Sequence, residues 1–386
     1  MKIVMLSPYF YPHTGGTEKY VRDVSAVLVQ KGHEVTVITN NLPRAKNAPR
    51  EETLPEGIKV IRLDAIDLFY YLPVSSQFNL QMLEGYDIVH AHVPSFSFLR
   101  SVAGKIKQPL IVTYHCDMTV SEKYFGVPVP QFLVPSVENA SNFYAKQFLP
   151  KADAIITTTE TYAASSPVMK DFPHHAVPIG IFHDKIDEIQ KKLNLTPDKK
   201  NKKQILFLGR LAGNKGCDYL VKAMPKILAK FPDTKLIICG DGEEKAHILD
   251  LVTQFDIGRS ITFLGTATFE RLIELYYTSL IYIFPSINRL EAFGIVQLEA
   301  MSNYTAVVAS DIPGPNAVME NGKSGLLVQK QNPDALADAV NSLLGDPEKA
   351  LAMGRRGREL VEQKYNWGAI GDRIIDIYKE ALNKKR

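Results

Sequence analysis

Short apolar runs alternate with longer amphipathic segments along most of this chain. In the first half, five runs predict buried strands, at Ile3–Leu6, Val35–Ile38, Ile88–Ala91, Leu110–Thr113 and Ala154–Thr158. A more polar run at Ile58–Leu63 predicts a strand nearer an edge, and Thr17–Gln30 has helical spacing that ends at Lys31 and Gly32. Because the five runs are mostly apolar and β-branched, they favour a parallel sheet that helices cover on both faces.

The second half repeats this alternation. Six further strands are predicted, at Gln204–Leu208, Lys235–Cys239, Ile261–Leu264, Leu280–Phe284, Ala306–Ala309 and Leu326–Val328. Helical patterns lie between them, for example at Tyr219–Lys230 and Asp334–Leu344. The segment Asp184–Lys203 is rich in lysine and polar residues, which is typical of an exposed linker. Two α/β halves joined by a linker predict two Rossmann-like domains that face a cleft.

The last segment, Trp367–Leu382, is amphipathic. Its apolar residues recur at helical spacing, at Ile370, Ile374, Ile377, Tyr378 and Leu382. The pattern by itself leaves two interpretations open: the helix finishes the second domain, or it returns to pack on the first.

Composition limits the classes of protein to consider. The chain has 386 residues, which is long for a single hydrophobic core. Its formal net charge is only +3 and no basic face dominates, which argues against a nucleic-acid partner. Three cysteines, Cys116, Cys217 and Cys239, lack CxxC spacing and favour a reducing compartment over zinc or redox chemistry. No apolar run reaches the roughly 18 residues of a spanning helix, and Ile3–Leu6 is too short for a signal peptide. The composition therefore predicts a soluble or peripheral protein.

The most informative stretch lies between Pro285 and Met301. A loop after the predicted strand carries Glu291, and Gly294 then leads into a helical pattern that carries Glu299. A helix N-terminus at the end of a strand presents free N–H groups and suits an anion, while carboxylates accept hydrogen bonds from hydroxyls. A site that combines the two suggests a nucleotide-sugar. The alternative interpretation is an ordinary strand and helix with two surface glutamates.

The form E-A-F-G-I-x-x-L-E-A in this stretch resembles the signature of the retaining glycosyltransferases of family 4, which have the GT-B fold. The resemblance implies that Glu299 binds the nucleoside ribose and that Glu291 faces the hydroxyls of the donor sugar. It also implies that the backbone of Phe293, Gly294 and Ile295 reaches the sugar and the phosphate.

A second cluster follows the first predicted strand of the second half. Gly209 and Arg210 end that strand, and Lys215 follows five residues after Arg210. A glycine turn with two cations before a helix suits a diphosphate, although a solvated turn with surface cations gives the same pattern. The form G-R-x-x-x-x-K-G resembles the family's donor-phosphate site, which implies catalytic roles for Arg210 and Lys215. Gly240 resembles the family's loop beside the nucleobase.

In the first half, Gly15 and Gly16 directly precede a predicted helix, where glycine lets backbone approach a ligand. The resemblance places this glycine loop over the donor phosphate and sugar. His115 ends a predicted strand in the form T-Y-H-x-D, which resembles the family's strand-end histidine that contacts the transferred sugar. Asp117 is a candidate to orient His115.

Three features leave alternatives open or depart from the family pattern. His90 and His92 have a spacing that also suits a metal, but the third ligand is missing nearby. Asp311–Ala317 lacks the glutamate of the family's G-G-x-P-E form, which puts a donor contact from that loop in doubt. The aromatic residues of Glu122–Pro150 favour core packing or a surface that faces lipid or glycan.

These features together predict an α/β protein of the GT-B type. The resemblance implies that residues 1–183 plus 370–386 form an acceptor-side domain to which the C-terminal helix returns, and that 184–369 form a donor domain. The expected activity is retaining transfer of a mannose-type or glucose-type hexose from a nucleotide diphosphate sugar to a glycan or lipid-linked hydroxyl in cell-envelope glycan assembly. We expect no cofactor, no required metal, no nucleic acid, and a cytoplasmic location with peripheral membrane contact. A nucleotide-sugar epimerase and a non-catalytic binding subunit are the alternatives.

Overall fold

The computed structural model describes residues 1–13, 15–42, 48–67, 73–75, 77–93, 96–99, 102–119, 123–124, 127–128, 132, 134–196 and 199–385. The chain divides into two compact units. The first contains Met1–Met118, Pro135–Ile179 and Trp367–Arg386, and the second contains Thr119–Val134 and Gly180–Asn366. The assignment of the acceptor to the first domain and of the donor to the second stays a prediction.

The first unit is built on an eight-stranded sheet with the order β12-β11-β8-β7-β1-β2-β4-β3. All neighbouring strands pair in parallel except β3 with β4. The strands are β1 (Lys2–Leu6), β2 (Glu34–Asn41), β3 (Glu51–Thr53), β4 (Lys59–Asp64), β7 (Ile88–Val93), β8 (Leu110–Tyr114), β11 (Ala154–Thr157) and β12 (His175–Ala176). A short antiparallel pair, β5 (Ile66–Asp67) with β6 (Pro73–Val74), accompanies it, and another, β9 (Lys123–Tyr124) with β10 (Val127–Pro128), lies among the residues of the second unit.

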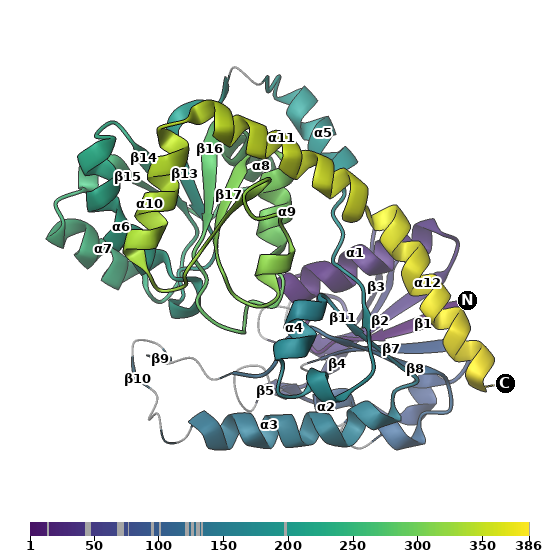
Figure 1. The fold of residues 1–386 in the computed structure, drawn as a ribbon. Helices are drawn as coiled ribbons and strands as arrows, with labels where there is room; N and C mark the ends of the chain where they lie inside the picture. Colours follow the sequence, from purple (N-terminus) through teal and green to yellow (C-terminus); the bar gives the residue numbers. More distant parts are fainter. Residues whose placement is uncertain are drawn as a thin grey trace. The chain divides into compact units, whose positions relative to one another are not determined.

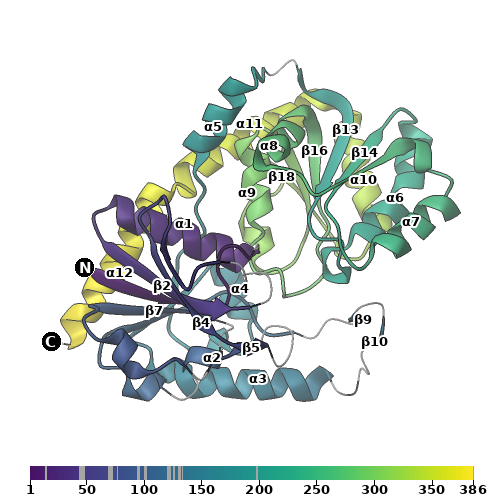
Figure 2. The same ribbon diagram turned by 180° about the vertical axis from the view of Figure 1, so that it is seen from behind.

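The helices of the first unit include the C-terminal one. They are α1 (Gly16–Gln30), α2 (Phe96–Leu99), α3 (Val134–Phe148), α4 (Glu160–Ser165) and α12 (Trp367–Lys385). Figures 1 and 2 both show α12 beside α1. The two helices approach closely because Gly371 lacks a side chain, and a Cβ at that position would lie 2.4 Å from Val27 Cγ1. The Tyr378 hydroxyl of α12 also contacts His90 Nδ1 of β7 over 2.6 Å, which anchors the last helix in the first unit.

The second unit has a six-stranded parallel sheet with the order β15-β14-β13-β16-β17-β18. Its strands are β13 (Asn201–Leu208), β14 (Lys235–Cys239), β15 (Ile261–Gly265), β16 (Ser279–Phe284), β17 (Ala306–Ser310) and β18 (Gly325–Val328). Its helices are α5 (His183–Lys192), α6 (Cys217–Lys230), α7 (Lys245–Gln254), α8 (Phe269–Thr278), α9 (Ile295–Ser302), α10 (Pro333–Leu344) and α11 (Pro347–Lys364). Figure 1 shows α10 on the near face of this sheet, and Figure 2, from behind, shows α8 on the other. Both faces are therefore covered, which explains the near-continuous apolar character of the strands.

The prediction of an exposed linker at Asp184–Lys203 is wrong for most of the segment. Its first part forms helix α5, which buries Ile186 and Gln190 and packs against α8. Lys200, near the end of the segment, is also buried. Polar composition suggested a linker, but the few apolar residues of α5 lie on one face and are enough to hold it on the second unit.

The aromatic residues of Glu122–Pro150 do not behave alike. Phe148 is buried in the first unit, whereas Phe132 and Phe143 are 78% and 62% exposed. Core packing is therefore right for Phe148 and wrong for the other two. Glu122 and Phe125 lie outside the described residues.

Candidate active site

Two glycines bring the ends of β13 and β14 into backbone contact. The Gly209 N–H donates to the Cys239 carbonyl over 3.0 Å, and the Gly240 N–H donates to the Gly265 carbonyl over 2.7 Å. Gly240 has a φ of 140°, and a Cβ there would lie 1.9 Å from the Gly209 carbonyl oxygen. Because only glycine tolerates this approach, the two loops meet backbone to backbone at the carboxyl edge of the sheet.

The turn after β13 packs against the loop after β16. It contains a short 3-10 helix, η7 (Gly213–Lys215), and ends at Gly216, which has a φ of 65°. A Cβ on Gly216 would lie 2.1 Å from the Pro285 carbonyl oxygen. The Ile287 N–H donates to the Asn214 carbonyl over 3.0 Å and fixes the two loops together. This packing sets the direction in which the last side chain of η7 leaves the turn.

That side chain is Lys215, and its ammonium forms an ion pair with the Glu291 carboxylate. The Lys215 and Glu291 side chains are 27% and 13% exposed, so the pair is partly shielded from water. The Ser286 hydroxyl donates to the same Glu291 oxygen over 3.4 Å. The structure therefore brings together two of the predicted catalytic residues, which come from loops at the ends of adjacent strands.

Gly294 starts helix α9 immediately after this loop. It is the N-cap residue with a φ of 83°, and a Cβ there would lie 2.8 Å from Phe284 Cζ. Because Gly294 has no side chain, it cannot accept a hydrogen bond from the first turn of the helix, which begins at Ile295. The N–H groups of this turn carry the partial positive charge that suits an anion. Phe293 is buried, and its ring packs edge-on against Tyr365 with 6.1 Å between the centroids.

Glu299 lies one turn further along α9 and is 7% exposed. The Tyr276 hydroxyl of α8 donates to Glu299 Oε2 over 3.3 Å. Burial, followed by the neighbouring Glu299 carboxylate, raises the pKa of Tyr276 well above its ordinary value. The phenol therefore stays protonated and remains a hydrogen-bond donor to Glu299. Burial, and then the charges of Glu291 and Glu299, also raise the pKa of Tyr282 well above its ordinary value, and the Tyr282 hydroxyl donates to the Leu208 carbonyl over 3.2 Å.

Arg210 points to a different partner. Its guanidinium forms an ion pair with Glu243, with 3.0 Å between Arg210 Nη2 and Glu243 Oε2, and the Arg210 side chain is 46% exposed. Gly209 and Gly240 follow two adjacent strands, β13 and β14, and they contact each other. Arg210 comes directly after Gly209 and therefore lies beside this contact. The ion pair with Glu243 is exposed, and exposed ion pairs contribute about 1 kcal/mol or less.

The predicted site residues of the first unit lie at the start of α1 and the end of β8. Gly15 is the N-cap residue of α1, and Gly16 is its first residue. Tyr20, one turn into α1, packs edge-on against His115, with 4.9 Å between the ring centroids. His115 Nε2 lies 3.1 Å from His92 Nδ1, and burial lowers the pKa of His115 to about 3. His115 is therefore a neutral imidazole at physiological pH.

The metal alternative for His90 and His92 finds no support in these contacts. His90 uses both ring nitrogens in hydrogen bonds, with the Tyr378 hydroxyl over 2.6 Å and the Thr113 hydroxyl over 2.7 Å. Burial, and then the charge of His115, lower the pKa of His90 to about 3. Over the described ranges of the chain, no group of three or more His, Cys, Asp or Glu side chains is arranged to hold a metal.

Sequence reasoning missed contacts that three residues make with the predicted ones. Tyr276 contacts Glu299, Ser286 contacts Glu291, and His92, which the sequence suggested only as a metal ligand, contacts His115. Tyr276 and His92 meet their partners through the fold, whereas Ser286 lies five residues from Glu291 in the same loop. Asp117, the candidate to orient His115, instead accepts hydrogen bonds from the hydroxyls of Tyr114, Tyr162 and Ser166.

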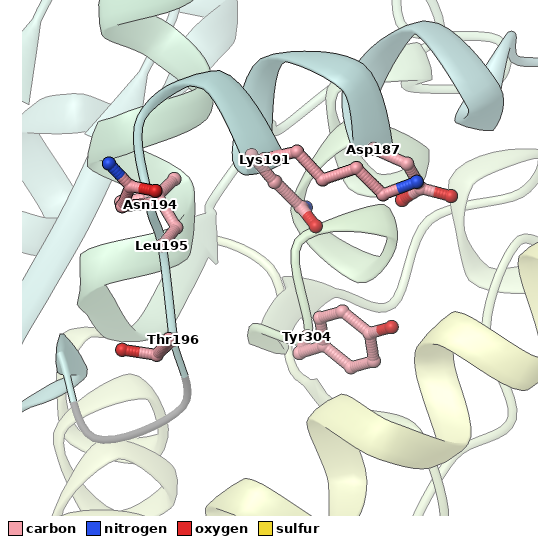
Figure 3. Close-up of a pocket in the computed structure, with 7 residues that line it drawn as sticks. Asp187, Lys191, Asn194, Leu195, Thr196 and Tyr304 are labelled. Atoms are coloured by element: carbon pink, nitrogen blue, oxygen red, sulfur yellow. The ribbon is translucent and has the colours of Figure 1, made fainter.

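A pocket of about 540 Å³ in the second unit lies apart from these groups. Its lining residues are Asp187, Gln190, Lys191, Asn194, Leu195, Thr196 and Tyr304. Figure 3 shows Asp187 and Lys191 on helix α5, Asn194 to Thr196 on the segment that follows it, and Tyr304 facing them. None of the predicted site residues lines this pocket.

Comparison with known proteins agrees with this arrangement. The family model described as Glycosyltransferase Family 4 matches residues 14–177, and that described as Glycosyl transferases group 1 matches residues 187–360. An uncharacterized glycosyltransferase of Methanocaldococcus jannaschii is 26% identical over 99% of both chains. The phosphatidyl-myo-inositol mannosyltransferase of Mycolicibacterium smegmatis is 26% identical over 98% of this chain and 94% of that protein.

Among solved structures, sucrose-phosphate synthase from Thermosynechococcus elongatus superposes with a TM-score of 0.79, with 26% identity over 99% of both chains. The two α/β units with their parallel sheets thus define a glycosyltransferase of the GT-B fold. The chain belongs to glycosyltransferase family 4 and is a retaining hexosyltransferase. Within the part of the chain that the structure describes, no helix combines the length and the apolar character needed to cross a bilayer.

Proposed function

We propose that this enzyme transfers a mannose-type or glucose-type hexose from a nucleotide diphosphate sugar to a hydroxyl of a glycan or lipid-linked acceptor, in cell-envelope glycan assembly. The observation that carries the proposal is the ion pair between Lys215 and Glu291 beside the N-terminus of α9. A cation, a carboxylate and free helix N–H groups are the groups that a diphosphate joined to a sugar requires.

In this proposal the diphosphate lies between Arg210, Lys215 and the first turn of α9. Lys215 then shares its protons between Glu291 and a phosphate oxygen, and Arg210 leaves Glu243 to bind the other phosphate. The two cations stabilise the negative charge that develops on the departing nucleotide diphosphate. The backbone contact of Gly209 with Gly240 leaves room for the phosphate chain and the nucleobase at this edge.

The carboxylates hold the two sugars of the donor. Glu299, kept in place by the Tyr276 hydroxyl, accepts hydrogen bonds from the ribose hydroxyls. Glu291 accepts from the hydroxyls of the transferred hexose. His115 contacts the same hexose as a neutral imidazole, which binds a hydroxyl without adding charge. The glycine loop of Gly15 and Gly16 covers the donor phosphate and sugar.

The transfer step breaks the bond between the anomeric carbon and the phosphate oxygen. The electron pair of that bond leaves with the nucleotide diphosphate, and the anomeric carbon gains oxocarbenium-ion character. The acceptor oxygen attacks from the face that the diphosphate leaves, so the configuration is retained, and the departing phosphate takes the acceptor's proton. The enzyme's own groups therefore stabilise charge rather than supply a hydrolase-type acid and base pair.

A lipid-linked or glycan acceptor is supported by the family relatives. The Mycolicibacterium relative is by name a mannosyltransferase that acts on phosphatidyl-myo-inositol. A cytoplasmic location with peripheral membrane contact fits such an acceptor, and the exposed Phe143 of the first unit and Phe132 of the second provide apolar surface.

The test begins with the donor. Thermal stability is measured with UDP, GDP, ADP and CDP, each with and without magnesium, because a ligand of the folded state adds about 2.7 kcal/mol at a hundredfold excess over Kd. The nucleotide that raises Tm identifies the base, and its mannose and glucose conjugates are then tested for transfer to phosphatidyl-inositol and to free glycans. No shift with any nucleotide would refute the assignment of Arg210 and Lys215 to the donor. Release of epimerised sugar without transfer would support an epimerase instead.

A further inference from the structure

Lys200 is a buried cation with no acidic partner among the described ion pairs. It is 9% exposed, and its ammonium donates to the carbonyls of Tyr277 over 2.8 Å and Ser279 over 2.9 Å. It also donates to the Thr305 hydroxyl over 2.9 Å and to the Asn303 carbonyl over 3.3 Å. An ammonium has three protons, so three short bonds and one longer, shared contact use its whole donor capacity.

These acceptors lie where two helices end. Tyr277 is in the last turn of α8, Ser279 is the C-cap residue of α8, and Asn303 is the C-cap residue of α9. Helix C-termini leave unpaired carbonyls and carry partial negative charge, so a cation satisfies and stabilises both ends. A single lysine side chain from the segment before β13 thus joins the C-termini of α8 and α9.

The same two helices hold the buried carboxylate of the donor site. Tyr276, next to Tyr277 in α8, donates its hydroxyl to Glu299, and the Asn303 side-chain amide donates to the Glu299 backbone carbonyl over 2.8 Å. The Thr305 hydroxyl that accepts from Lys200 donates to the Tyr276 carbonyl over 2.5 Å. Asn303 and Thr305, which Lys200 contacts beyond the last turn of α9, are therefore each hydrogen-bonded to the backbone of Glu299 or of Tyr276.

We propose that Lys200 is a positioning residue for the donor nucleotide: by joining the ends of α8 and α9, it fixes the distance over which Tyr276 holds Glu299 toward the ribose. The proposal rests on the proposed function, because it takes Glu299 to be the ribose ligand. Lys200 acts through Tyr276 and Glu299 and does not touch the substrate.

Burying the charge of Lys200 costs free energy, which a side chain that only fills the core would not require. Burial lowers the pKa of Lys200 to about 7, because the loss of hydration disfavours the charged form, while all four contacts require donors. An apolar side chain would avoid that cost but would leave the helix-end carbonyls unpaired. The neighbouring Lys202 shows the contrast, because it lies on the surface and pairs with Glu348 over 3.0 Å.

The experiment measures ribose recognition by the full-length enzyme. The affinity for the nucleoside diphosphate that binds the wild type (from UDP, GDP, ADP and CDP) is compared with that for its 2′,3′-dideoxy form. Variants are Lys200→Met, Glu299→Gln as a benchmark, Thr305→Val as a second route to the same contacts, and Lys202→Met as the surface control. Tm and circular dichroism confirm that each variant is folded.

We expect the wild type and Lys202→Met to prefer the ribonucleotide about tenfold, as a hydrogen bond to a charged group provides. In Lys200→Met, Thr305→Val and Glu299→Gln the preference should fall to about threefold or less. If Lys200→Met does not fold, Thr305→Val decides the result. A preference that stays at about tenfold in a folded Lys200→Met or Thr305→Val, even with lower stability, overturns the proposal and leaves the proposed function intact. A wild type that binds the nucleotide but shows no preference removes Glu299 from the ribose, which overturns this proposal together with the Glu299 role in the proposed function but leaves hexose transfer itself untouched.

Discussion

Removal of the Lys215 ammonium is the sharpest test of the candidate active site. In Lys215→Met the side chain keeps about the same length and loses its charge, so Glu291 keeps only the Ser286 hydroxyl from its two described partners. The position of the loop should not change, because backbone contacts of Asn214 and Gly216 hold it. The substitution therefore separates the charge from the fold.

The expected loss follows from the contact that disappears. A charge-assisted hydrogen bond to a phosphate contributes about 1.5–3 kcal/mol, and one donor that stabilises developing charge contributes about 10²–10³-fold in kcat. We expect kcat to fall about 100-fold, or about 2.7 kcal/mol. The free energy of unfolding should change by about 1 kcal/mol, because both side chains of the pair still reach water, 27% and 13% exposed.

The assay follows release of the nucleotide diphosphate at saturating donor and acceptor, so that kcat is measured apart from KM. The matched control is Lys222→Met, which removes a lysine of helix α6 that pairs with Asp218 over 2.7 Å and is 35% exposed. The control should keep full activity. A folded Lys215→Met that keeps wild-type kcat would refute the assignment of Lys215 to the departing diphosphate.

Three further predictions concern the supporting structure. Gly240→Ala should lose about 3 kcal/mol of stability and bind nucleotide more weakly, because its Cβ would lie 1.9 Å from a backbone oxygen. The control Gly265→Ala, at a φ of 66° with open space around the Cβ, should lose only about 1 kcal/mol, and equal losses of the two variants in urea unfolding would contradict this. Folding lowers the pKa of His90 and of His115 from 6.5 to about 3, so the unfolded chain binds more protons and stability is lost as pH falls below 6.5. Each histidine should lower the free energy of unfolding by about 2 kcal/mol between pH 7 and pH 5, and urea midpoints that do not change over that range would disprove this. Gly371→Leu should lower Tm by several degrees, because the added side chain drives α12 away from α1. The control Ala369→Leu, at an exposed position of the same helix, should leave Tm unchanged, and similar Tm values for the two variants would show that the packing is looser than described.

The hydrophobic pattern by itself determined the class of fold. Apolar β-branched runs, amphipathic helices and the glycines after β13, β14 and β16 depend on local periodicity and backbone freedom, which sequence shows directly. The Glu291 and Glu299 motif was likewise readable, since both residues lie within one strand-loop-helix segment. Family membership, which the comparisons confirm, followed from these local features.

Only the tertiary structure decided which groups meet. Lys215 and Glu291 are 76 residues apart, and they pair because β13 and β16 are neighbours in a sheet whose strand order is not the chain order. Within Lys199–Lys203 the composition is uniformly polar, yet Lys200 is buried at two helix ends while Lys202 faces water. Local composition reports how polar a segment is, but burial of one side chain depends on what the rest of the fold places above it. The buried contacts of Lys200 and the pairing of Glu291 with Lys215 are therefore properties of the fold and not of any local pattern.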